Sequence, residues 1–131
     1  MNGRSPTGAV FVVDDDPGVA SSLRFLFETE GFRVETFADG ADLLAARLPG
    51  PEDCLLIDYK LRSGDGLELV RRLRELQVET PVLLFTIYEG LEKKAAAVGV
   101  HHVLLKSNLA ENIVRRVEAV MKGWRGGDGG G

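Results

Sequence analysis

The chain has 131 residues, 44% of them hydrophobic, and its length predicts one domain with a core of ordinary size. No apolar run approaches the ~18 residues of a membrane-spanning helix, the N-terminal residues lack the apolar region of a signal peptide, and the single cysteine, Cys54, agrees with a reducing compartment, so we expect a cytoplasmic protein with no membrane contact. Lys and Arg number 16 against 20 Asp and Glu, and a net charge of -4 argues against direct nucleic-acid binding.

The first predicted strand is AVFVV at 9–13, whose continuous apolar pattern is typical of a strand buried on both faces of a parallel sheet. A helix follows, with Asp16 as its N-terminal cap, Pro17 at its first position and Gly31 after its end. RVETF at 33–37 alternates in polarity and predicts an edge strand. The helix between these two predicted strands has an apolar stripe that consists of Val19, Leu23, Leu26 and Phe27.

A second helix is predicted to begin after Asp39 and to end near Pro49. The buried strand CLLI at 54–57 comes next, and a third helix opens at Asp65 or Gly66 through turn and cap chemistry. The apolar face of this helix consists of Leu69, Val70, Leu73 and Leu76.

The remaining elements continue the alternation of strand and helix. VLLF at 82–85 and VLL at 103–105 predict two more buried strands, and a helix over about 89–98 lies between them and stops at Gly99. A fifth helix opens at Ser107 or Asn108. Its buried face is predicted to contain Leu109, Ile113, Val117 and Val120.

Composition also sets the domain limits. We expect a flexible N-terminal segment at 1–8, a folded domain at 9–122, and a glycine-rich flexible tail or linker at 123–131. The tail is either the natural end of a single-domain protein or the point at which an output domain begins.

Five strands alternating with five helices predict a doubly wound α/β fold, because parallel strands need right-handed helical crossovers that cover both faces of the sheet. Ligands of such sheets bind beyond the carboxyl ends of the strands. Polar residues follow four of the five predicted strands directly. They are Asp14, Asp15, Asp58, Thr86 and Lys106.

This residue set predicts phosphoryl chemistry. Three carboxylates beside one lysine cannot all stay ionised and dry without a cation, and Mg²⁺ fits because it takes one or two carboxylates and leaves positions for phosphate oxygens. Lys106 can neutralise one further anionic oxygen, and Thr86 can donate a hydrogen bond to another. Asp58 is then the candidate nucleophile that accepts a phosphoryl group as an aspartyl phosphate. Asp16 is assigned to the helix cap and not to the metal.

The span 9–122 resembles the receiver domain of bacterial two-component response regulators. The motifs that carry the resemblance are VVDDDP (12–17), LLIDYKLRSGDGLEL (55–69), PVLLFT (81–86) and GVHHVLLKS (99–107). The resemblance implies a flavodoxin-like sheet of order 2-1-3-4-5 between five helices. It also implies a protein that is not an enzyme beyond the formation and hydrolysis of its own aspartyl phosphate.

The resemblance assigns roles to the same residues. It implies that Asp14 and Asp15 form the acidic metal pocket with the phosphoacceptor Asp58, and that the backbone carbonyl of Lys60 is a further metal ligand. It implies that Thr86 is the switch hydroxyl and Lys106 the phosphate-binding lysine. The partners that it implies are a sensor histidine kinase or phosphotransfer protein as donor and an output domain or target protein as receiver of the signal.

Two departures from the family pattern leave an alternative open. Receivers usually have a small residue after the switch hydroxyl, where this chain has Ile87, and an aromatic residue three before the lysine, where it has Val103. An atypical receiver that acts as a phosphate-independent interaction module is the alternative reading. A phosphohydrolase working through an aspartyl phosphate would have a nucleophile after the first strand, a second acid two residues on and usually a threonine. DDDPG matches that pattern poorly, and the chain has no room for a cap domain over a substrate.

Overall fold

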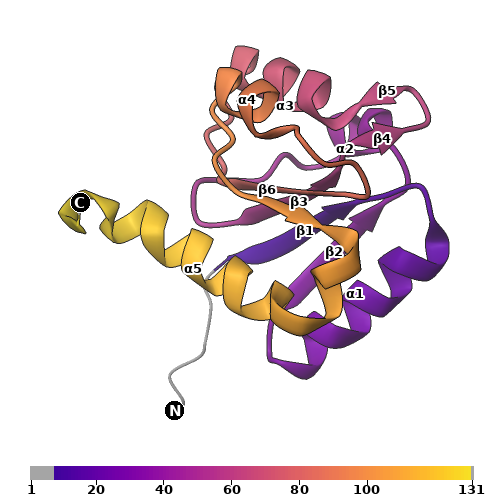
Figure 1. Cartoon of the computed structure of the whole chain (residues 1–131), viewed down its shortest axis with the longest axis horizontal. Helices are drawn as coiled ribbons and strands as arrows, with labels where there is room; N and C mark the ends of the chain where they lie inside the picture. Colours follow the sequence, from indigo (N-terminus) through magenta and orange to yellow (C-terminus); the bar gives the residue numbers. More distant parts are fainter. Residues whose placement is uncertain (1–7, 131) are drawn as a thin grey trace.

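The computed structural model describes residues 8–130, with the side chains of 108–111 and 123–130 outside the description. Residues 1–7 of the predicted N-terminal segment also lie outside the described residues. Figure 1 shows a twisted sheet with helices on both faces.

The central sheet has five parallel strands in the order β2-β1-β3-β6-β7. Counted along the chain without the two short strands β4 and β5, this order is the expected 2-1-3-4-5, with the polar-alternating strand at one edge. The five strands are β1 (Ala9–Val13), β2 (Arg33–Phe37), β3 (Cys54–Asp58), β6 (Val82–Thr86) and β7 (Val103–Leu105).

Both faces of the sheet are buried, as the continuous apolar strands predicted. In β1, Phe11 and Val13 belong to the core shared with α2, α3 and α4, whereas Val10 and Val12 belong to the core shared with α1 and α5. Figure 1 shows α3 and α4 on one side of the sheet and α1 and α5 on the other. Each buried Val, Leu, Ile or Phe side chain contributes about 1.5–3 kcal/mol. The helices are α1 (Pro17–Thr29), α2 (Gly40–Ala45), α3 (Gly66–Glu75), α4 (Glu92–Ala97) and α5 (Leu109–Gly130).

The caps of α1 and α3 follow the sequence prediction. The Asp16 carboxylate accepts hydrogen bonds from the backbone N–H groups of Gly18 and Val19, at 2.9 and 3.3 Å. Gly31 ends α1 with φ at 94°, a left-handed conformation that favours glycine. Asp65 caps α3 by accepting from Glu68 N at 2.8 Å.

Other local predictions were wrong. Helix α2 ends at Ala45 and not near Pro49, because Ala46 has an extended backbone that cannot continue the helix. Its N-terminal residue Asp39 makes no side-chain cap and instead accepts hydrogen bonds from the Ser63 hydroxyl and backbone N–H. Leu76, expected on the apolar face of α3, is exposed because it already caps the end of that helix.

The connections beside the sheet hold further differences. Helix α4 covers only Glu92–Ala97, shorter than the predicted 89–98, and ends before Gly99, whose φ is 83°. Two short antiparallel strands, β4 (Lys60–Leu61) and β5 (Gly64–Asp65), were not predicted. Two residues are too few for periodicity to reveal a strand.

At the C-terminal end, a 3-10 turn at Lys106–Asn108 precedes α5, which runs past residue 122 to Gly130. The domain boundary at 122 and the flexible character of 123–131 stay predictions. On the buried face of α5, Ile113, Val117 and Val120 are buried as expected, whereas the side chain of Leu109 lies outside the described residues.

A buried carboxylate lies at the amino end of the sheet, away from the predicted site. Asp53 accepts from Ala9 N and from Gly50 N, each at 2.7 Å, and the Thr80 hydroxyl donates to the Gly50 carbonyl at 2.8 Å. These bonds satisfy Asp53 inside the protein and tie β1 to the turn before β3.

No helix among the described residues is long and apolar enough to cross a membrane.

Candidate functional site

The predicted site residues meet at the carboxyl edge of the sheet. β1 pairs with β3 so that Val13 lies opposite Ile57, which places the next residues, Asp14 and Asp58, beside each other. The backbone N–H of Asp14 also bonds the Phe37 carbonyl at the end of β2, at 3.0 Å, which holds the start of the acidic loop in place.

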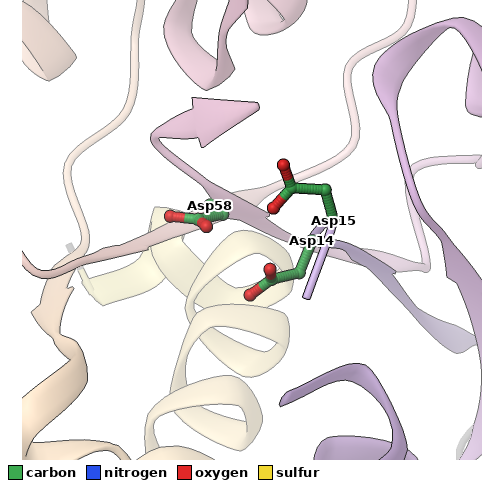
Figure 2. Close-up of side chains that lie close together, drawn as sticks. All are labelled: Asp14, Asp15 and Asp58. Carbon is green, nitrogen blue, oxygen red and sulfur yellow. The ribbon is translucent and has the colours of Figure 1, made fainter. Parts of the chain in front are cut away.

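Three carboxylates form one cluster, as Figure 2 shows. One oxygen from each of Asp14, Asp15 and Asp58 lies within 4.8 Å of the others. Asp14 is 1% exposed and Asp58 7%, whereas Asp15 is half-buried and closes the cluster toward solvent. The sequence prediction that these three side chains converge is therefore correct in geometry.

Lys106 reaches this cluster from the end of β7. Its Nζ donates to Asp14 Oδ2 at 3.1 Å and to Asp58 Oδ2 at 3.0 Å, so one ammonium group bridges two buried carboxylates. The same Nζ lies 5.1 Å from the centroid of the Phe85 ring, within the range of a cation–π contact. Without a metal, the Lys106 ammonium therefore partly neutralises the negative charge of Asp14 and Asp58.

Burial and charge change the pKa values of this pair. Burial raises the pKa of Asp58 above its ordinary 3.8, and the Asp14 charge adds to the rise, which outweighs the lowering effects of Lys106 and of a hydrogen bond from the backbone of Lys60. Burial alone would lower the pKa of Lys106, but its bonds to Asp58 and Asp14 outweigh burial and raise it. The site therefore has an excess of negative charge that the lysine does not fully balance.

Thr86 is the last residue of β6 and is fully buried. Its neighbour Phe85 pairs with Asp58 across the sheet, which puts Thr86 next to the carboxylate cluster. The Thr86 Oγ1 atom accepts a hydrogen bond from the Tyr88 backbone N–H at 3.0 Å, a local turn of the kind that Ser and Thr hydroxyls make. Its hydroxyl proton stays available as a donor.

Lys60 enters the site through its backbone, because its side chain is exposed. Its backbone lowers the pKa of the Asp58 carboxyl, while the role of its carbonyl as a metal ligand stays a prediction. The chain then turns back at Gly66, whose N–H donates to the Tyr59 carbonyl at 2.6 Å. A Cβ at Gly66 would lie 2.3 Å from the Asp58 carbonyl oxygen, so only glycine allows this close approach beneath Asp58.

The donor set suits a hard divalent cation. Carboxylate oxygens are the ligands that Mg²⁺ prefers, and it usually keeps several waters. An open cavity of about 340 Å³ adjoins Asp14 and Asp15 and gives room for those waters. Arg24 and Arg62 also line this cavity.

The two departures from the family pattern differ in their surroundings. Ile87 is 69% exposed at the edge that carries the site. Val103 is half-buried in β7 and packs against the core. Sequence reasoning also missed the contact between Tyr59 and Tyr88, because both residues lie in loops where periodicity gives no signal.

Comparison with known proteins agrees with this geometry. The family described as response regulator receiver domain matches residues 10–118. The chain is 30% identical over 124 residues to the response regulator MprA of Mycolicibacterium vanbaalenii, covering 93% of this chain and 54% of that protein. It is 29% identical over 117 residues to the uncharacterized transcriptional regulatory protein YkoG of Bacillus subtilis, covering 88% and 51%. The chain thus spans about half the length of these curated relatives.

Solved structures show the same fold. The chemotaxis protein CheY4 of Vibrio cholerae superposes with a TM-score of 0.73 at 28% identity, covering 86% of this chain and 98% of that one.

Proposed function

This chain belongs to the response regulator receiver domain family, and from that premise we propose that Asp58 accepts a phosphoryl group in a Mg²⁺-dependent reaction. The observation that supports the proposal most is the pair of buried carboxylates, Asp14 and Asp58, bridged by the Lys106 ammonium at 3.1 and 3.0 Å. Burying the charges of Asp14, Asp58 and Lys106 costs desolvation free energy, and a dication bound to the carboxylates together with an anionic ligand bound to the lysine would offset that cost.

We assign the metal ligands to Asp14, Asp15, Asp58 and the backbone carbonyl of Lys60. When bound, Mg²⁺ neutralises carboxylate charge and withdraws electron density from phosphoryl oxygens. The clustering of three carboxylate oxygens within 4.8 Å supports this assignment.

The transfer step uses the chain's own groups. A carboxylate oxygen of Asp58 attacks phosphorus and forms the new P–O bond, while the bond from phosphorus to the donor's leaving group breaks and its electron pair departs with that group. The Lys106 ammonium, already against Asp58, pairs with a phosphoryl oxygen as the charge moves outward. The Thr86 hydroxyl donates to another phosphoryl oxygen. Water is the acceptor when the acyl phosphate is later hydrolysed.

We infer that the donor is a sensor histidine kinase or a phosphotransfer protein, and that the signal passes through protein contacts to an output domain or target. Several relatives have names that describe transcriptional regulators, and this chain spans about half of their length. We place the protein in the cytoplasm, which the single buried thiol of Cys54 supports. We propose no enzymatic activity beyond the modification and demodification of Asp58.

The test is incubation with Mg²⁺ and a small acyl phosphate, followed by intact mass measurement. We expect wild type to gain the mass of one phosphoryl group and Asp58→Asn to gain none. Asp53→Asn is the matched control, because Asp53 is a buried aspartate at the opposite end of the sheet, and it should be phosphorylated if it folds. An unmodified wild-type mass, with Mg²⁺ binding shown separately, would favour the phosphate-independent interaction module.

A further inference from the structure

Two tyrosines join the loops that leave the candidate site. Tyr59 directly follows Asp58, and Tyr88 lies two residues after Thr86. Their rings meet edge to face, with centroids 6.1 Å apart and planes at 76°, a geometry that aromatic pairs prefer. The chain contains only these two tyrosines, so any tyrosine signal reports on this contact.

The two rings are not held equally. Tyr59 is half-buried and packs against the core, and its carbonyl accepts from Gly66 N. Tyr88 is 42% exposed. Tyr59 is therefore the fixed side of the contact and Tyr88 the side that is free to move.

The backbone of Tyr88 acts directly on the proposed switch hydroxyl. Its N–H donates to Thr86 Oγ1 at 3.0 Å, which takes one of the two acceptor positions of that oxygen. The Thr86 O–H is thereby restricted to the directions that remain. Any displacement of Tyr88 therefore changes where the Thr86 hydroxyl can donate.

We propose that the ring contact between Tyr59 and Tyr88 positions the Thr86 hydroxyl, and that Tyr88 shifts on Tyr59, without losing the contact, when that hydroxyl donates to a phosphoryl group on Asp58. Tyr88 is then a positioning residue for the reaction. The second half of this inference rests on the proposed phosphorylation of Asp58, whereas the first half concerns the unmodified protein. The coupling does not use Val103, which has no ring.

The first half is tested by amide hydrogen exchange with ¹⁵N-labelled tyrosine and phenylalanine. Replacing Tyr59 by Leu keeps an apolar side chain but removes the ring, so we expect the Tyr88 amide to exchange about two- to tenfold faster, the range of one aromatic contact. Tyr59→Phe keeps the ring and should match wild type. The Phe11 amide in the buried strand β1 is the reference for opening of the whole domain. Unchanged Tyr88 exchange, or equal acceleration at Phe11, overturns the inference.

The second half is tested with the same proteins, Mg²⁺ and a small acyl phosphate. We expect the Tyr88 ring signals to shift when intact mass shows one phosphoryl group. Tyr59→Leu should be phosphorylated two- to tenfold more slowly than wild type, and Tyr59→Phe should restore the rate. A missing mass gain refutes the proposed function while the exchange experiment still decides on the positioning contact. Phosphorylation of Tyr59→Leu at the wild-type rate, with unmoved Tyr88 signals, refutes the coupling itself.

Discussion

Replacing Lys106 by Met should strongly destabilise the metal-free protein. Methionine retains an unbranched chain of similar length but leaves Asp14 and Asp58 facing each other without a cation. Breaking a buried charge pair by removing one partner costs about 3–5 kcal/mol, and we expect the lower end because the Lys106 side chain is 18% exposed. For a domain of this size, a loss of about 3 kcal/mol lowers Tm by roughly 10–15 °C.

Urea unfolding followed by circular dichroism measures this loss. Lys94→Met on the exposed face of α4 is the control, and its free energy of unfolding should stay within about 0.5 kcal/mol of wild type. Mg²⁺ should stabilise Lys106→Met more than it stabilises wild type, because the ion then replaces the positive charge that Lys106 supplied to Asp14 and Asp58. Binding at 100 times Kd is worth about 2.7 kcal/mol. A metal-free loss below about 1 kcal/mol would show that the ammonium bridge behaves like an exposed ion pair and contributes little to the stability of the protein.

Three further outcomes follow from the same site. The pKa of Asp58 in the folded state is above its ordinary 3.8, so the folded state binds the proton more tightly, and the metal-free protein loses stability as pH rises from 3.8 through the folded pKa. Asp58→Asn should lose this pH dependence and be more stable than wild type at neutral pH. Urea unfolding measured across that pH range tests both expectations. Asp15→Ala should abolish Mg²⁺ binding in a calorimetric titration, because it removes one of three clustered carboxylates, and Mg²⁺ binding that is retained would place the metal elsewhere. The same substitution relieves repulsion between the carboxylates and should raise the metal-free stability by up to about 1 kcal/mol. Ile87→Ala should speed both the phosphorylation of Asp58 and the hydrolysis of the product, by about fivefold if the isoleucine side chain adds about 1 kcal/mol of steric cost to each step. Unchanged rates in this variant would show that Ile87 does not cover the approach to Asp58.

The strands and the site were predictable for one physical reason. A strand buried on both faces must be continuously apolar, so the first polar residue after it marks the sheet edge, and this located Asp14, Asp58 and Lys106 together. The caps Asp16 and Asp65 were equally local and were predicted correctly.

What sequence could not show depends on contacts between distant segments. Asp39 is a residue type that often caps helices, but its carboxylate accepts a hydrogen bond from the hydroxyl of Ser63, 24 residues away. The tyrosine contact and the close approach of Gly66 to Asp58 arise only after β3 and its neighbours have assembled. Leu76 fits the helical stripe of α3, and only the position of the helix end exposes it. Tertiary contacts override local preference at these positions.

The buried Asp53 has a consequence for the opposite end of the molecule. By holding Ala9 N and Gly50 N, it sets the point at which β1 starts relative to β3. Side chains alternate along a strand, so a slip of one residue would turn Asp14 toward the wrong layer of helices and separate it from Asp58. The distance between the Asp14 and Asp58 carboxylates therefore depends on hydrogen bonds at the opposite end of the sheet, because Asp53 lies five residues before Asp58. A substitution near Asp53 can change the geometry of the acidic cluster without contacting it.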